Sequence, residues 1–180
     1  KHDDYMTPKS AWEAIDEFIP KDKVIWEAFK GDGKSGEYLT ELGCEVIHND
    51  NDFFQSNEGE VIITNPAFSI VKDIIPRLVE LDKPFILLMP VSKIATQYFK
   101  PFMNKIQIII PDKRIEFVKL VDGKEVKSKS NLESSVNSFI ILSNSFCCSG
   151  LYLTPMPSVF ELSISTFIFS KCSISIRSVN

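Results

Sequence analysis

Between residues 23 and 110, short apolar runs of strand length alternate with segments whose apolar residues recur at helical spacing. This pattern predicts strands over 23–26, 45–48, 61–64, 85–89 and 106–110. It predicts helices over 34–42 and 70–79, a helix marked by Ile94, Tyr98 and Phe102, and a first helix capped by Thr7 with Pro8 at its first position. Such alternation implies a mainly parallel sheet with helices on both faces, and a binding site beyond the carboxyl ends of the strands.

Composition divides the chain at residue 127. Ser accounts for 15 of the 53 residues in 128–180, against 5 of the 127 before them, and the later segment holds few charges. We therefore expect a folded core over 1–127, ending in a hairpin that turns at Asp122-Gly123. Residues 128–180 form a Ser-rich tail, which is either a β-rich extension or a frameshifted segment.

The net charge, the apolar runs and the cysteines limit which partners, metals and compartments the sequence favours. A formal net charge of −4 argues against a broad nucleic-acid-binding face. A local basic track remains, made of Lys93, Lys100, Lys105, Lys113, Arg114 and Lys119. No apolar run of about 18 residues predicts a membrane span. The four Cys lack the spacing of a zinc site, so no metal and a reducing compartment are expected.

A glycine-rich turn, 27–36, follows the first predicted strand of the core and allows a ligand to approach the backbone closely. Gly33-Lys34-Ser35 matches the end of a triphosphate-binding loop, but Ala28 stands where that motif needs Gly. Gly31-x-Gly33-x-x-Gly36, followed by Asp50, also fits the dinucleotide fingerprint.

S-adenosylmethionine is the third candidate cofactor. It has no phosphate, so its site needs open backbone for the methionine part and an acid for the ribose hydroxyls. Glu27 at the strand end, Gly31 and Gly33 in the turn, and Asp50 after the next strand meet these needs. The glycines alone do not separate this cofactor from a dinucleotide.

The next buried strand ends in Asn65-Pro66-Ala67-Phe68, and this tetrapeptide indicates a chemistry. The lone pair of an arylamine is delocalised into its ring. Two acceptors for the amine hydrogens direct that lone pair towards a methyl donor. The Asn65 side-chain oxygen and the Pro66 carbonyl can supply them, while Phe68 offers a ring on which a base stacks.

Here the chain resembles the amino-group DNA methyltransferases, whose strand-end motif is Asn/Asp-Pro-Pro-aromatic; Ala67 replaces the second Pro. The resemblance covers roughly residues 3–119. Asp4-Tyr5-x-Thr7-Pro8 resembles the segment that closes over the methionine part of the cofactor, and Asp52-Phe53 the pair that receives the adenine. Pro111-x-x-Arg114-Ile115-x-Phe117 is similar to a late segment of phage and viral members.

The resemblance implies a Rossmann-like class I methyltransferase fold that transfers a methyl group from S-adenosyl-L-methionine to N6 of a flipped-out adenine in DNA. It implies a DNA partner, no membrane and no metal, in the cytoplasm of a bacterium or a virus-infected cell. The implied catalytic residues are Asn65, Pro66, Ala67 and Phe68. The implied cofactor residues are Tyr5, Thr7, Pro8, Glu27, Ala28, Phe29, Gly31, Gly33, Asp50, Asp52, Phe53 and Asn65.

Other functions remain open at this point. Cytosine N4, guanine N2 in ribosomal RNA and the protein glutamine side chain need the same two acceptors. A decayed methyltransferase that only binds, and a nicotinamide oxidoreductase, are the alternatives from other classes.

Overall fold

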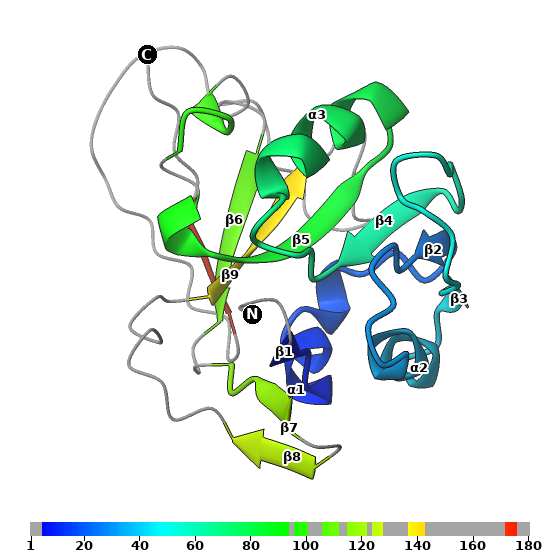
Figure 1. Ribbon diagram of the computed structural model, residues 1–180, viewed down its shortest axis with the longest axis vertical. Helices are drawn as coiled ribbons and strands as arrows, with labels where there is room; N and C mark the ends of the chain where they lie inside the picture. Colours follow the sequence, from blue (N-terminus) through cyan, green and yellow to red (C-terminus); the bar gives the residue numbers. More distant parts are fainter. Residues whose placement is uncertain are drawn as a thin grey trace.

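A seven-stranded sheet forms the centre of the structure, a computed structural model that describes residues 5–93, 96–100, 106–111, 115–121, 124–127, 137–142 and 172–175. The strand order is β10-β6-β9-β5-β4-β2-β3 (Figure 1). Four neighbouring strands are parallel: β3 (Glu45–Ile47), β2 (Val24–Trp26), β4 (Val61–Thr64) and β5 (Phe85–Pro90). Each lies within about a residue of its predicted position.

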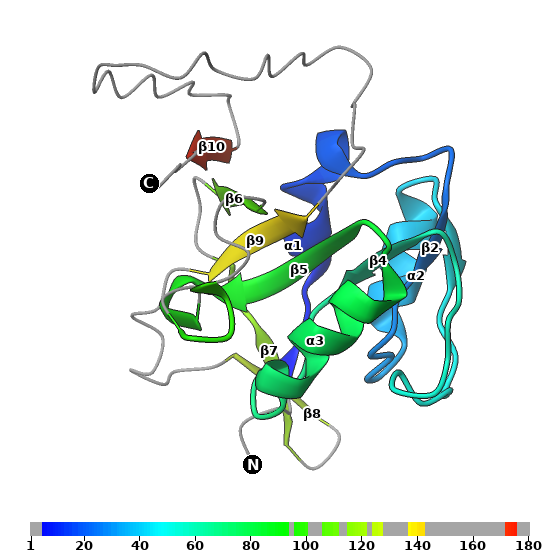
Figure 2. The same cartoon turned by 90° about the horizontal axis from the view of Figure 1, so that it is seen from above.

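The other three strands of this sheet are antiparallel to their neighbours. They are β9 (Asn137–Leu142), β6 (Ile106–Pro111) and β10 (Cys172–Ser175). β9 lies between β5 and β6 and pairs with both, and β10 pairs with the outer edge of β6 (Figure 2). Two strands from the Ser-rich segment therefore belong to the sheet. The division of the chain at residue 127 stays a prediction, because most later residues lie outside the described ones.

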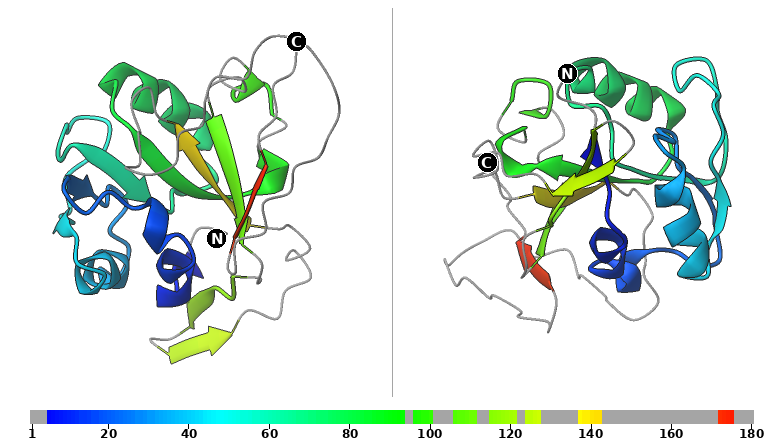
Figure 3. Two further views of the ribbon diagram at one scale, coloured as in Figure 1. Left: turned by 180° about the vertical axis from the view of Figure 1, so that it is seen from behind. Right: turned by 60° about the horizontal axis from the view of Figure 1, so that its bottom comes forward.

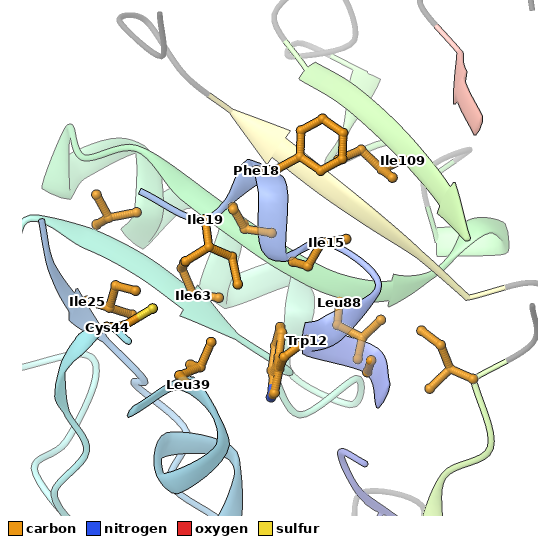
Figure 4. Packing of buried hydrophobic residues seen from close by; sticks show 14 residues of the cluster. Trp12, Ile15, Phe18, Ile19, Ile25, Leu39, Cys44, Ile63, Leu88 and Ile109 are labelled. Atoms are coloured by element: carbon orange, nitrogen blue, oxygen red, sulfur yellow. The ribbon is translucent and has the colours of Figure 1, made fainter. Parts of the chain in front are cut away.

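Helices cover both faces of the sheet, as predicted, and the strands alternate their side chains between two cores. Ile63, Ile86 and Leu88 face the helices α1 (Lys9–Glu13) and α2 (Lys34–Glu41), where Trp12 and Leu39 pack (Figure 4). The residues that alternate with them along the same strands face the helix α3 (Val71–Leu81) on the opposite side of the sheet. Burial on both faces explains why these strands are apolar throughout. The architecture is the predicted Rossmann-like α/β fold.

Two helix predictions need correction. Thr7 does not cap α1: the helix begins at Lys9 with Pro8 at its N-cap and no side-chain capping bond, because Thr7 belongs to the buried extended segment before it. The helix over 70–79 is present as α3, which continues through Pro76 although a proline inside a helix removes a backbone hydrogen bond. In place of a helix around Tyr98, the described residues form a 3-10 turn, η2 (Val91–Lys93), and a turn over 96–100; the other residues there lie outside the description. A second 3-10 turn, η1 (Asp16–Phe18), follows α1.

A second, three-stranded sheet joins the start of the described chain to a hairpin. β1 (Tyr5–Met6) pairs with β7 (Val118–Val121), which pairs with β8 (Lys124–Lys127). The predicted hairpin is confirmed by the antiparallel register, although its two turn residues lie outside the described ones. This small sheet lies beside α1 at one end of the molecule (Figures 1 and 3). Among the described helices, none has the length and hydropathy to cross a membrane.

Candidate functional site

A cavity of about 320 Å³ lies at the carboxyl ends of β2, β3 and β4. Four chain segments far apart in sequence line it: the β1 segment, the glycine turn after β2 with the start of α2, the loop after β3 and the loop after β4. The lining residues are Tyr5, Met6, Thr7, Glu27, Ala28, Phe29, Lys30, Gly31, Asp32, Ser35, Asn49, Asp50, Asn51, Asn65, Pro66, Ala67 and Phe68. A cavity at this edge of a parallel sheet is where such folds bind ligands.

Most of the residues that the sequence singles out meet in this cavity, including all of Asn65-Pro66-Ala67-Phe68. Pro8, Gly33, Asp52 and Phe53 are not among the lining residues, so their predicted contacts with a cofactor stay predictions. Six further residues line the cavity that the sequence motifs do not include: Met6, Lys30, Asp32, Ser35, Asn49 and Asn51. All six flank a predicted residue or lie inside the glycine turn, so adjacency was the only available signal.

The glycine turn adopts a conformation that other residues resist. Gly31 and Gly33 have φ angles of 56° and 86°, in the left-handed region. Asp32 Oδ1 accepts a hydrogen bond from the Lys34 backbone N–H at 3.1 Å, which secures the start of α2. A Cβ atom at Gly31 would lie 3.4 Å from the Met6 sulfur, so the β1 segment lies directly over the turn.

Glu27 is a buried acid at the end of β2, with 1% of its surface exposed. Its Oε1 accepts hydrogen bonds from the Thr64 hydroxyl and, at 3.1 Å, from the Phe29 backbone N–H. Its Oε2 has no partner among the described residues. Burial raises the pKa of Glu27 to about 7, and the nearby Ser35 hydroxyl, together with the donors Thr64 and Phe29, opposes this rise. Glu27 therefore carries a free, desolvated oxygen within the cavity lining.

Asn65 carries a second buried acceptor. β4 ends at Thr64, so Asn65 is the first residue of the loop at the carboxyl edge of the sheet. Its Oδ1 is buried without a partner among the described residues, and the residue lines the same cavity as Gly31 and Asp50. Because buried polar atoms are nearly always hydrogen-bonded, two such acceptors around one cavity indicate a ligand that donates to them.

Asp50 lies at the exposed edge of the cavity and forms an ion pair with the glycine turn. The Lys30 Nζ is 2.8 Å from its Oδ2, and 84% of the Asp50 side chain is exposed. On either side, Asn49 and Asn51 donate hydrogen bonds to Glu58 at 2.7 and 2.6 Å. These bonds hold the loop in place and leave the Asp50 carboxylate accessible.

Asp52 and Phe53 play a supporting part behind the cavity. Asp52 accepts hydrogen bonds from the Phe54 N–H at 2.9 Å and the Gln55 side chain at 3.1 Å, so it closes its own turn. Phe53 is buried, and its ring centroid lies 5.1 Å from that of Phe29, which lines the cavity. The Phe53 ring thus fixes the position of a lining aromatic.

The charged residues of the cavity are mostly acidic. Glu27, Asp32 and Asp50 line it, and Lys30 is the single Lys or Arg among the lining residues. Over the part of the chain that the structure describes, no group of three or more His, Cys, Asp or Glu could hold a metal ion. The site therefore offers its ligand acids and backbone groups, with one paired cation.

Comparison with known proteins gives no family. No family model matches the chain, and no curated protein matches it. Among solved structures, it is similar to a precorrin-6y C5,15-methyltransferase from Geobacter metallireducens GS-15, with 10% sequence identity. The match covers 78% of this chain and 92% of that one, with a TM-score of 0.38.

Proposed function

We propose that this protein binds S-adenosyl-L-methionine in the cavity and transfers its methyl group to a planar exocyclic amine, with N6 of adenine in DNA as the leading substrate. One observation carries the proposal. Two buried acceptors that have no partner among the described residues, Glu27 Oε2 and Asn65 Oδ1, belong to residues that line one cavity. Glu27 Oε2 suits the ammonium of the cofactor, and Asn65 Oδ1 suits an amine that is to be methylated.

The charge of the cavity favours this cofactor over the two phosphate-bearing alternatives. S-adenosylmethionine is cationic at its sulfonium and ammonium groups, and three acids line the cavity. A dinucleotide or a triphosphate brings several negative charges that need donors. The one lining cation, Lys30, is already paired with Asp50.

Each part of the cavity has a place in cofactor binding. Glu27 accepts from the ammonium, the Gly31 turn admits the methionine part, and Asp50 accepts from the ribose hydroxyls. The cofactor, when bound, supplies a methyl group on a sulfonium. Tyr5, Met6 and Thr7 line the cavity from the β1 side, where they can contact the methionine part of the cofactor.

The loop after β4 then acts on the amine. Asn65 Oδ1 and the Pro66 carbonyl accept its two hydrogens, which directs the nitrogen lone pair at the methyl carbon. Phe68 packs partly against the core and presents the remaining ring surface to the base. No general base with a specially adjusted pKa is needed, because alignment and complementarity to the transition state supply the rate enhancement.

The choice of adenine in DNA rests on the resemblance of Asn65-Pro66-Ala67-Phe68 and its upstream motifs to the amino-group DNA methyltransferases. The base must leave the duplex to reach the cavity, and stacking on Phe68 offsets part of that cost, by about 1–3 kcal/mol. Cytosine N4, guanine N2 and glutamine amides present the same pair of hydrogens and are the competing substrates.

Labelled methyl transfer tests the proposal. Protein, labelled S-adenosylmethionine and unmethylated DNA are incubated, and the DNA is digested so that N6-methyladenine and N4-methylcytosine are separated. We expect label in N6-methyladenine and its loss in Asn65→Ala. Asn57→Ala removes an exposed amide outside the cavity and serves as the control. Ribosomal RNA and protein acceptors are assayed in parallel.

Two results would contradict the proposal. Binding of S-adenosylmethionine without transfer to any acceptor would identify a decayed methyltransferase that only binds. Affinity for NAD without affinity for S-adenosylmethionine would identify an oxidoreductase.

A further inference from the structure

We infer that Thr64 is a positioning residue: its buried hydroxyl aims the Glu27 carboxyl at the cavity and links it to the loop that carries Asn65. The inference deepens the proposed function and rests on it for the identity of the ligand. It assigns a role in cofactor binding to a side chain that does not line the cavity.

The geometry places Thr64 between the two unpartnered acceptors. Thr64 is fully buried as the last residue of β4, and its backbone is held by pairing with Leu87 of β5. Its hydroxyl donates to Glu27 Oε1, and Asn65 follows directly in the chain. Because β2 and β4 are parallel neighbours, this hydroxyl spans the two strand ends that supply the site.

The hydroxyl determines which oxygen of Glu27 remains free. Oε1 already accepts from Thr64 and from the Phe29 N–H, whereas Oε2 accepts from no described residue. Without Thr64, the carboxyl loses a donor that resists its rotation. Oε2 would then no longer be held as the acceptor for a cation.

The same bond favours the charged form of Glu27 near neutral pH. Burial raises the pKa of Glu27 to about 7, while the nearby Ser35 hydroxyl, donation by Thr64 and the Phe29 N–H lower it. A cationic ligand group binds the carboxylate better than the neutral acid. Removing the hydroxyl therefore raises the pKa further and reduces the fraction of protein ready to bind at neutral pH.

Other titratable groups line the same cavity as Glu27 and could also affect binding as the pH changes. From the β1 segment, the glycine turn and the loop after β3, these are Tyr5, Lys30, Asp32 and Asp50. Lys30 pairs with Asp50, and the Lys34 ammonium lies 4.0 Å from Asp32. Thr64→Val leaves all four of these groups in place, so a difference between this variant and the wild type reports on the loss of the Thr64 donor.

The first measurement is the affinity for S-adenosylmethionine from about pH 5 to about pH 9. In the wild type we expect the affinity to rise with pH through the Glu27 midpoint. Thr64→Val keeps the side-chain shape without the donor, and we expect its midpoint to rise by about one pH unit, with affinity at neutral pH reduced by up to about tenfold. Thr64→Ser restores the hydroxyl and should follow the wild type.

The second measurement separates this inference from the proposed function. The carboxyl carbon of Glu27, assigned with Glu27→Gln, is titrated by NMR with no cofactor added. A higher midpoint in Thr64→Val supports the positioning role even if no S-adenosylmethionine binds, a result that would overturn the proposed function alone. An unchanged midpoint overturns the positioning role whatever the cofactor does. If Thr64→Val fails to fold, Thr64→Ala replaces it in both measurements.

Discussion

Lys30 and Asp50 join the glycine turn to the loop after β3, with Nζ and Oδ2 2.8 Å apart at the exposed edge of the cavity. The pair connects the two segments that the proposed function assigns to the methionine and ribose parts of the cofactor. An exposed pair of this kind contributes at most about 1 kcal/mol. A ligand hydroxyl can therefore compete for the Asp50 carboxylate at little cost.

The ion pair between Lys30 and Asp50 predicts that substitutions of its two residues change the affinity for S-adenosylmethionine unequally. Asp50→Asn should weaken binding of S-adenosylmethionine by roughly tenfold, because it removes a charged acceptor from the ribose. Lys30→Gln should change the affinity by less than about threefold, because it only frees Asp50. Calorimetric titration of both variants checks this. Equal losses in the two variants would contradict the assignment of Asp50 to the ribose.

The buried acid Glu27 predicts a pH-dependent cost to stability. Its pKa in the folded protein, about 7, lies above its ordinary value of 4.5, so the folded state holds the proton more tightly than the unfolded chain does. Stability therefore falls as the pH rises between these two values and stays low above them.

Glu27→Gln removes this cost, because a neutral amide needs no desolvation of charge. We expect the variant to be more stable than the wild type by on the order of 2–3 kcal/mol at mildly alkaline pH, with no gain under acid conditions. Urea denaturation across the pH range without added cofactor measures the difference. The variant should also lose affinity for S-adenosylmethionine. A gain in stability that does not vary with pH would be inconsistent with a titrating Glu27.

Gly36 in α2 packs closely against His48. Alanine, which is normally better than glycine inside a helix, should therefore destabilise the protein at this position. A Cβ atom there would lie 2.4 Å from His48 Cγ. Alanine normally stabilises a helix interior by about 1 kcal/mol relative to glycine. Here Gly36→Ala should destabilise the protein by about 1–3 kcal/mol through the clash.

The control for this prediction is the same substitution made in a His48→Ala background. With the ring removed, alanine at position 36 should become neutral or stabilising. Denaturant unfolding of the four proteins gives the coupling free energy between the two positions. Additive effects would show that the close approach of residues 36 and 48 is relieved without cost.

Ala67 predicts a gain of function, because it stands where the resembling enzymes carry proline. Proline restricts the unfolded and flexible states of a loop, which is worth about 0.4–1 kcal/mol where the backbone is compatible. Ala67→Pro should therefore raise kcat by about two- to fivefold with KM little changed. Ala67→Gly, which loosens the loop, should lower kcat. Steady-state methyl transfer with both variants tests whether rigidity of this loop limits turnover.

Local patterns were enough to predict the parallel part of the fold. The short apolar runs at 61–64 and 85–89 became β4 and β5, and the glycines after residue 30 formed a left-handed turn before α2. These features depend on near neighbours in the chain, so they can be recognised without the fold. The order of Glu27, Asp50 and Asn65 along the chain was likewise sufficient to expect them at one edge of the sheet.

Long-range packing decided the rest. Insertion of β9 between β5 and β6, pairing of β1 with β7 and the bond from Thr64 to Glu27 all join residues distant in sequence. A capping role for Thr7 was a reasonable local prediction and was wrong, because the segment is recruited instead to the wall of a cavity. Which oxygen of Glu27 stays free depends on the three-dimensional distribution of donors around it. No property of the strand Val24–Trp26 that precedes it contains that information, since the Thr64 donor comes from another strand.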